Sequence, residues 1–264
     1  MGNILKTIMA AKRREVDAAR KVRPLAELQA TVADAPPVRP FETPLAARGP
    51  IKLIAEVKKA SPSKGVIRAD FRPVELARVY EQHGATCISV LTDGEFFQGS
   101  LDVLRAVRAA VTLPVLRKDF VLDAYQVLEA RVAGADAVLL IAECLERDEM
   151  RRLFDTIGEL NMTALVEFYE PGNVEKVLDL GATLVGVNNR NLSTFEVDLD
   201  HTIRMRREIP DDCTLVAESG IRHRGDVERL EEAEVQAMLV GERLMAADDV
   251  GRAVDILLGK TFSV

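Results

Sequence analysis

Cysteine is scarce in this chain of 264 residues, which contains three of them. Cys87, Cys144 and Cys213 lie far apart and are odd in number. This pattern argues against a disulfide framework and indicates a reducing, cytoplasmic setting. Each cysteine lies in or near an apolar run, so we expect all three to be buried packing residues.

Histidine is equally scarce. His83, His201 and His223 are scattered, and no pair of histidines or cysteines has the spacing of metal ligands. The chain also lacks a G-x-G-x-x-G motif after its first long apolar run, where a dinucleotide-binding fold would carry one. We therefore expect neither a metal ion nor a cofactor.

Long apolar runs and concentrated positive charge are missing as well. The longest uninterrupted apolar runs have five or six residues, too few to span a bilayer. The net charge is −7 with lysine and arginine spread along the chain, so there is no basic stripe for nucleic acid. The N-terminus has no apolar core segment and is not a secretory signal. We expect a cytoplasmic protein that binds neither membranes nor nucleic acid.

One pattern recurs from residue 51 onward: a short apolar run that ends in polar residues, followed by a helical pattern. Runs this short and this rich in Val, Ile and Leu are typical of buried parallel strands. Eight such units predict an α/β protein, a (β/α)8 TIM barrel. An open, doubly wound sheet is the alternative, which the count of eight disfavours. The predicted strands are 51–58, 86–93, 113–120, 136–143, 163–168, 183–191, 214–220 and 236–244.

Amphipathic helices are predicted between these runs. Three of the runs are introduced by a Gly-Ala pair, at Gly84, Gly134 and Gly181. Glycine supplies the left-handed cap that turns a helix back toward the next strand. The clearest predicted helices are 73–84, 123–135, 146–160 and 226–235.

Residues 1–50 stand outside the repeat. Their first part has helical spacing, and a proline-rich, irregular stretch follows it. We therefore expect one barrel domain over residues 1–264, with residues 1–50 forming an N-terminal extension that is packed on the barrel and folds over its mouth. The apolar positions that can share one helical face are Ile4, Ile8, Ala11 and Val16.

Charged residues occur where strands should be buried. Side chains alternate along a strand, so Glu56 and Lys58 point the same way. The side that faces the helices must be apolar, which leaves the barrel interior near its carboxyl-terminal mouth, where barrels carry their active sites. Two cations among three carboxylates shift each other's pKa values, as an acid–base site requires. The same reasoning adds Lys118, Glu167, Asn188 and Glu218 to this mouth.

A second pattern indicates phosphate binding. Gly220 and Gly241 follow the last two predicted strands, where barrels commonly hold a phosphate on backbone N–H groups. The loop "SPSKG" after the first strand adds hydroxyl groups and Lys64. Ser219 has no histidine at a plausible triad position, so we interpret it as a phosphate ligand and not as a nucleophile.

Seven segments, taken in order, resemble the indole-3-glycerol phosphate synthase family over the full length of the chain. They are "AEVKKASPSKG", "FFQGS", "PVLRKDF", "ALVEF", "GVNNRNL", "AESGI" and "LVGERLM". The resemblance implies a (β/α)8 barrel whose N-terminal extension helps to cover the active site. It also implies a lyase of tryptophan biosynthesis that needs no cofactor or metal. The substrate would be the phosphorylated anthranilate–ribulose compound 1-(2-carboxyphenylamino)-1-deoxyribulose 5-phosphate, which loses CO2 and water to give indole-3-glycerol phosphate.

The resemblance also assigns roles to residues. Lys118 is the expected general acid, which protonates the ketone oxygen as the aryl carbon attacks. Lys58 would pair with the substrate carboxylate and is a second candidate acid, and Glu167 would be the base. Which residue handles each proton stays open. The polar ring would be completed by Glu56, Asn188 and Glu218; phosphate binding falls on Ser61, Ser219, Gly220, Gly241 and Glu242; substrate binding falls on Ser61, Phe97, Phe120, Leu139, Arg190 and Leu192.

One position departs from the pattern, because some family members carry serine where this chain has Glu242. A carboxylate repels a phosphate, so we expect the backbone N–H to make that contact and the side chain to turn outward toward Arg243. Two rival functions stay open: a sugar-phosphate isomerase or Schiff-base aldolase that uses Lys118 as nucleophile, and a ligand-binding barrel without catalysis. We expect a monomer rather than an oligomer.

Overall fold

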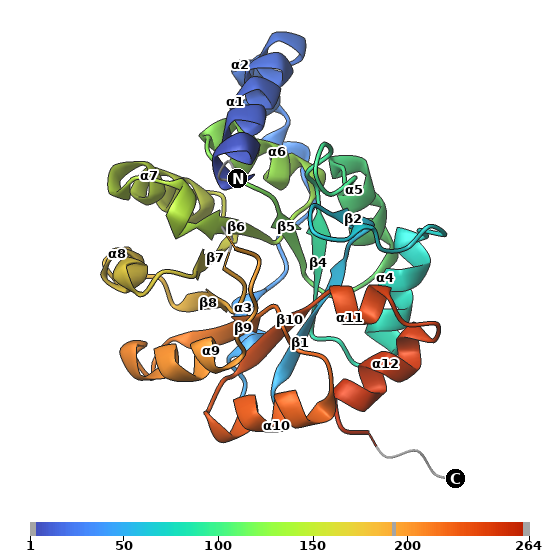
Figure 1. Ribbon diagram of the computed structural model, residues 1–264. Coiled ribbons are helices and arrows are strands. Elements are labelled where there is room, and N and C mark those ends of the chain that lie inside the picture. The colour runs from blue at the N-terminus through green and yellow to red at the C-terminus, as the bar shows by residue number, and fades with distance from the viewer. Residues whose placement is uncertain (1–3, 192–193, 261–264) are drawn as a thin grey trace.

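Eight parallel strands close into a barrel in the computed structural model, which describes residues 4–191 and 194–260 (Figure 1). Around the barrel the strands follow the order β1-β10-β9-β8-β7-β6-β5-β4. The predicted (β/α)8 barrel is therefore confirmed, and the open sheet is wrong. The strands are β1 (Lys52–Val57), β4 (Cys87–Leu91), β5 (Val115–Lys118), β6 (Ala137–Ile141), β7 (Thr163–Phe168), β8 (Leu184–Asn188), β9 (Thr214–Glu218) and β10 (Ala237–Val240).

Helices surround the barrel and connect its strands (Figure 1). They are α4 (Pro73–Gln82), α5 (Leu101–Ala110), α6 (Ala124–Ala133), α7 (Arg147–Glu159), α8 (Val174–Leu178), α9 (Asp200–Met205), α10 (Arg224–Glu232), α11 (Glu242–Met245) and α12 (Val250–Leu257). Short 3-10 turns are η2 (Ala142–Cys144), η3 (Pro171–Asn173) and η4 (Arg206–Glu208), and a small hairpin pairs β2 (Ala60–Ser61) with β3 (Gly65–Val66). The last predicted strand was drawn too long, because residues 242–244 belong to α11.

Sequence signals account for several turns of the barrel. Gly84, Gly134 and Gly181 have φ values of 87°, 88° and 75°, the left-handed conformation predicted for them. Asp123 caps α6 by accepting a hydrogen bond from the Tyr125 N–H. These signals explain where α4, α6 and α8 turn back toward the barrel and where α6 begins.

The core consists of the strands and the inner faces of the helices, and β4, β6, β8 and β9 are buried along their whole length. Cys87, Cys144 and Cys213 are buried, as predicted, and burial raises the pKa of each thiol. In the part of the chain that the structure describes, no helix is long and apolar enough to cross a membrane.

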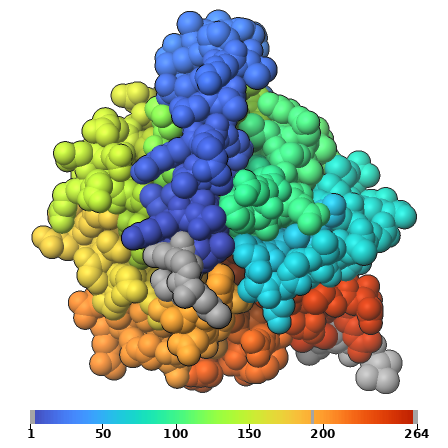
Figure 2. Space-filling model, turned by 45° about the horizontal axis from the view of Figure 1, so that its top comes forward, coloured from blue at the N-terminus to red at the C-terminus, as the bar shows by residue number. Residues whose placement is uncertain are grey.

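The N-terminal extension begins with α1 (Ile4–Val22) and continues through α2 (Leu25–Ala30), η1 (Val32–Asp34) and α3 (Glu42–Leu45). Figure 2 shows its blue segment crossing the surface of the barrel toward the centre. The expected irregular arm is therefore wrong in part, because Glu42–Leu45 within it form the short helix α3. The helix α2, between α1 and this arm, was not predicted. Phe41 and Leu45 are completely buried in the barrel core.

A separate cluster anchors the far end of α1. The Tyr125 hydroxyl on α6 donates to the carbonyl oxygens of Ala19 (3.2 Å) and Arg23 (2.9 Å). Around it Val16, Leu28, Tyr125 and Leu128 form a small apolar cluster of their own. The second half of α1 is thus attached to α6 by contacts that lie outside the barrel mouth.

Candidate active site

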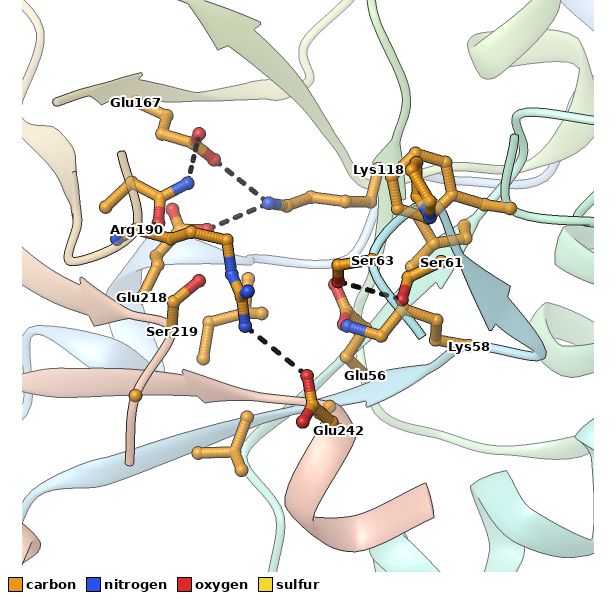
Figure 3. Close-up of a pocket in the computed structure, with 18 of the residues that line it drawn as sticks. Glu56, Lys58, Ser61, Ser63, Lys118, Glu167, Arg190, Glu218, Ser219 and Glu242 are labelled. Atoms are coloured by element: carbon orange, nitrogen blue, oxygen red, sulfur yellow. Dashed lines mark hydrogen bonds and ion pairs between the residues drawn. The ribbon is translucent and has the colours of Figure 1, made fainter. Parts of the chain in front are cut away.

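A cavity of about 380 Å³ opens where the strands end at their carboxyl termini (Figure 3). It contains every site residue predicted from the sequence except Leu192, which lies outside the described residues. The six residues expected from strand alternation therefore share this cavity with those expected from the family resemblance, and their roles stay predictions. The first turns of α1 complete the wall with Ile4, Leu5 and Ile8.

Lys118 lies at the centre of the first charged cluster, at the end of β5. Its Nζ is 2.9 Å from Glu167 Oε2 on β7 and 2.9 Å from Glu218 Oε2 on β9. The Asn188 amide on β8 donates to the other oxygen of Glu167, at 2.9 Å. Four strands thus bring an ammonium group, two carboxyl groups and an amide together, as Figure 3 shows for the labelled Lys118, Glu167 and Glu218.

The protonation states of this cluster follow from its geometry. Burial alone would lower the pKa of Lys118, but the charges of Glu167, Glu218 and Glu56 outweigh burial and raise it. Burial alone would raise the pKa of Glu167, but the Lys118 charge and the hydrogen bonds from Asn188 and Lys118 lower it. Burial and the charge of Glu167 raise the pKa of Glu218 to about 8, against the effect of Lys118. At neutral pH, Lys118 is therefore charged, Glu167 ionised and Glu218 protonated.

A second pair lies on β1. Lys58 Nζ is 2.6 Å from Glu56 Oε2, although Lys58 comes one residue after the strand ends. Two glycines, one within β8 and one directly after β10, make room for the carboxyl groups. A Cβ atom on Gly241 would lie 2.0 Å from Glu56 Oε2, and one on Gly186 would lie 2.4 Å from Glu218 Oε1. Gly241 was predicted only as a phosphate ligand, so its steric role was missed.

The predicted phosphate residues line one end of the cavity. Ser219 and Gly220 both have left-handed backbone conformations, with φ values of 67° and 82°. Ser61 and Ser63 lie across from them, with their hydroxyl oxygens 3.4 Å apart (Figure 3). Successive residues that turn their N–H groups the same way form a concave anion site.

The side chain of Glu242 does not turn toward Arg243, so that expectation is wrong. Its carboxylate lies 3.3 Å from the guanidinium of Arg190 and 3.7 Å from Lys64 Nζ. Arg243 instead donates from Nε to the carbonyl oxygen of Arg222, at 3.0 Å. Two cations from other loops thus hold the Glu242 carboxylate beside the residues predicted to bind phosphate.

An apolar wall faces the charged clusters. The rings of Phe97 and Phe120 have centroids 6.2 Å apart and are tilted by 40°. Leu139, from the middle of β6, extends this wall. The cavity therefore offers an apolar surface for a flat ring beside cations that can hold anionic groups.

Sequence reasoning missed Lys12, whose side chain is 1% exposed. It lies on the buried face of α1 and forms ion pairs with Asp93 and Asp119 directly behind the apolar wall. A signal was present, because Lys12 lies four residues after Ile8 and four before Val16, on the face predicted to be buried.

Over residues 4–191 and 194–260, no group of three or more His, Cys, Asp or Glu side chains could hold a metal ion. The pocket carboxylates instead face ammonium or guanidinium groups.

A family model and individual relatives both match this chain, and they agree on one family. A sequence model of the indole-3-glycerol phosphate synthase family matches residues 5–257. A protein of that name from Rhodopirellula baltica is 51% identical over 255 residues, covering 97% of this chain and 98% of its own. Another, from a Polaromonas species, is 51% identical over 262 residues, covering 98% of this chain and 99% of its own.

Solved structures share the architecture at low sequence identity. A 3-hexulose-6-phosphate synthase has a TM-score of 0.64 and 16% identity, and the match covers 79% of this chain and 99% of that one. A thiamine phosphate pyrophosphorylase from Pyrococcus furiosus has a TM-score of 0.59 and 18% identity, covering 78% and 93%. At these identities the similarity shows the fold alone.

Proposed function

The chain belongs to the indole-3-glycerol phosphate synthase family, and from that premise we propose how its pocket works. It is a carboxy-lyase of tryptophan biosynthesis and acts on a small phosphorylated substrate. The substrate we propose is 1-(2-carboxyphenylamino)-1-deoxyribulose 5-phosphate, and the products are indole-3-glycerol phosphate, CO2 and water. This substrate combines an aryl ring, a carboxylate and a phosphate, and the cavity has a matching surface for each.

Binding would use three parts of the cavity. The phosphate would lie at Ser61, Ser219, Gly220 and Gly241 and replace Glu242 as the partner of Arg190. The aryl ring would pack against Phe97, Phe120 and Leu139, and its carboxylate would pair with Lys58. These contacts would bring the aryl carbon and the ketone carbon together, which converts ring closure into an oriented, unimolecular step.

The chemistry would then run through Lys118. Its ammonium group would protonate the ketone oxygen while the aryl carbon attacks the ketone carbon and forms the new C–C bond. Loss of CO2 returns the electron pair of the broken C–C bond to the ring and restores aromaticity. In the dehydration, Lys58, no longer paired with the carboxylate, would give a proton to the hydroxyl group, which leaves as water, and Glu167 would accept the proton that is removed from the ring system. Glu56, Asn188 and Glu218 would hold these groups in position.

The observation that carries this proposal is the position of Lys118 Nζ, 2.9 Å from each of two carboxyl oxygens. Such an environment keeps the amine protonated, which is the state that an acid needs. A Schiff-base aldolase needs a neutral amine as nucleophile, and neighbouring carboxylates disfavour that state.

The direct test is an assay of the purified protein with the carboxyphenylamino substrate. We expect one CO2 for each indole-3-glycerol phosphate formed, and no inactivation when borohydride is added with substrate. Covalent trapping by borohydride at Lys118 would favour the aldolase. Tight binding of the substrate without product would favour a ligand-binding barrel.

We further propose that residues 1–264 act as a single catalytic domain, with residues 1–50 covering its mouth. A monomer in a reducing cytoplasm is the setting that fits best. The three cysteines are buried free thiols, which supports the reducing setting.

A further inference from the structure

Lys12 of the N-terminal extension places a charged side chain in the protein interior, where it contacts three carboxylates. Its Nζ lies 2.9 Å from Asp93 Oδ2 and 3.0 Å from Asp119 Oδ1, and it donates to Glu15 at 2.7 Å. Burial alone would lower the pKa of Lys12, but the charges of Asp119, Glu15 and Asp93 outweigh burial and raise it. The ammonium group therefore stays charged inside the protein.

Asp93 connects this ammonium group to the loop after β4. Its Oδ1 accepts hydrogen bonds from the backbone N–H groups of Phe96 (2.7 Å) and Phe97 (3.2 Å). Its Oδ2 faces Lys12. One carboxylate thus fixes the backbone at Phe97 with one oxygen and contacts α1 with the other.

Asp119 does the same for the loop after β5. Its Oδ1 accepts from the Phe120 N–H (2.9 Å) and faces Lys12. Its Oδ2 accepts from the Thr92 hydroxyl (2.6 Å) and from the guanidinium of Arg117 (3.1 Å). Asp119 is completely shielded on its side chain, so its position is determined by these partners.

We propose that Lys12 is a positioning residue, which sets the distance between the loops of Phe97 and Phe120 and thereby shapes the apolar wall. Without its charge, the two loops would lose the cation that attracts both carboxylates, and Asp93 would keep only the N–H groups of its own loop as partners, so the loops would move apart. The inference rests on the proposed function, in which this wall receives the aryl ring of the substrate.

The competing explanation is that Lys12 only attaches the extension to the barrel. The second half of α1 has its own attachment, through the hydrogen bonds of Tyr125 and the apolar cluster around Val16 and Leu28. The helix can therefore stay docked when the charge of Lys12 is removed, and the two roles can be separated by experiment.

The test compares Lys12→Met, which keeps an unbranched side chain, with Lys21→Met on an exposed part of the same helix. Binding of 2-aminobenzoate probes the aryl region, and binding of inorganic phosphate probes the other end of the cavity. We expect Lys12→Met to raise the Kd for 2-aminobenzoate by roughly tenfold, which corresponds to about 1.4 kcal/mol. Its Kd for phosphate and both constants of Lys21→Met should stay within about twofold of wild type.

The proposal is overturned if Lys12→Met weakens both ligands equally, or weakens neither while the protein melts earlier. If Lys12→Met does not fold, Asp93→Asn removes one half of the pair but keeps the oxygen that accepts from Phe97. It should weaken 2-aminobenzoate selectively, and an unchanged Kd would overturn the proposal. Wild-type protein that binds both probes but forms no product would instead contradict the proposed function.

Discussion

Lys12 and Lys118 each keep an ammonium group inside the protein, and each is held by at least two carboxyl groups. Their surroundings nevertheless differ in what can reach them. Lys118 lines the cavity, whereas Lys12 is 1% exposed, lies outside the cavity lining and contacts carboxylates of two loops that do line it. The first can transfer a proton to a bound ligand, and the second can act only through the groups it holds.

Replacing Lys118 by alanine should abolish most turnover, because the proposed proton donor is lost. General acid catalysis is typically worth about 10²- to 10⁴-fold in rate. Steady-state kinetics measure this loss, and phosphate binding with the far-UV CD spectrum should stay close to wild type. Lys52→Ala, at the opposite end of β1, is the matched control and should keep full activity. A kcat near the wild-type value in Lys118→Ala would remove it from the mechanism.

Replacing Glu242 by glutamine should strengthen phosphate binding. The carboxylate of Glu242 now holds Arg190 and Lys64, and an incoming phosphate must compete for these cations. Because the side chain is 37% exposed, screening limits the effect to roughly two- to tenfold in Kd. Titration with inorganic phosphate measures it, with the exposed Glu232→Gln as control. Weaker phosphate binding in Glu242→Gln would show that the carboxylate assists the site.

The ends of the barrel strands are the elements that make this site. Strand alternation predicted six charged or amide side chains of the cavity, because alternate residues share one face of a strand. It does not keep charge off the other face, where Arg117 of β5 donates to the Gln126 carbonyl oxygen on α6. The contact of Glu242 with Lys64 could not be predicted in this way, since the two residues are far apart in the sequence. The sequence analysis gave no bounds for α5 or for the turns η2 to η4. For α5 a signal was present, because Ser100 caps this helix.

The cluster across β5, β7 and β9 predicts a pH dependence. The pKa of Glu218 is raised from 4.5 to about 8, so the carboxyl group is neutral below that pH. Its ionisation makes the cluster net negative, which repels an anionic substrate and holds the Lys118 proton more tightly. We expect kcat/KM to fall as pH rises through about 8. Glu218→Gln, measured over the same pH range, should have a lower kcat/KM that does not fall near pH 8.

The raised pKa of Glu218 also determines how the stability of the protein changes with pH. Between pH 4.5 and about 8 the unfolded chain has lost this proton, while the folded protein keeps it. The contribution of Glu218 to the free energy of unfolding therefore decreases as pH rises across that window. Urea unfolding of wild type and Glu218→Gln at several pH values would measure the difference, and an opposite slope would contradict the raised pKa.

Deleting residues 1–34 should separate the two parts of the extension. The deletion removes α1 and α2 but keeps Phe41 and Leu45 in the core. We expect KM to rise and kcat/KM to fall roughly tenfold or more, with a modest decrease in Tm. Phe41→Ala in the full chain should instead lower Tm strongly and leave KM close to wild type. The loss of a buried phenylalanine typically costs about 3–5 kcal/mol. A deletion variant with normal KM and a much lower Tm would make the first 34 residues a structural clamp.

At the scale of the whole molecule, the barrel and the position of its cavity were predictable from the sequence, because strand count and strand polarity determine both. Lys12 was not recognised, because a lysine counts as solvated until its partners are known. Asp93 and Asp119 reach it only after the extension folds over β4 and β5. The position of the extension therefore depends on tertiary contacts, which local sequence patterns do not encode.

Activity should survive exhaustive dialysis against a chelator. The cavity carboxyl groups of Glu56, Glu167 and Glu218 lie against ammonium groups, which occupy the places where a divalent ion would bind. Rates measured before and after chelation should agree within error. Lost activity that returns with a divalent ion would show that the ring of carboxylates also serves as a metal site.

The two glycines that give Glu56 and Glu218 their space restrict the order in which this barrel can change. A methyl group on Gly241 would collide with the carboxylate of Glu56, and one on Gly186 with that of Glu218. The opposite order of substitutions meets no such obstacle, because shortening either glutamate first leaves room beside its glycine. A lineage that gave this scaffold a new chemistry would therefore have to abandon an acidic group first and fill the space afterwards, so the old activity would disappear before the new pocket took shape.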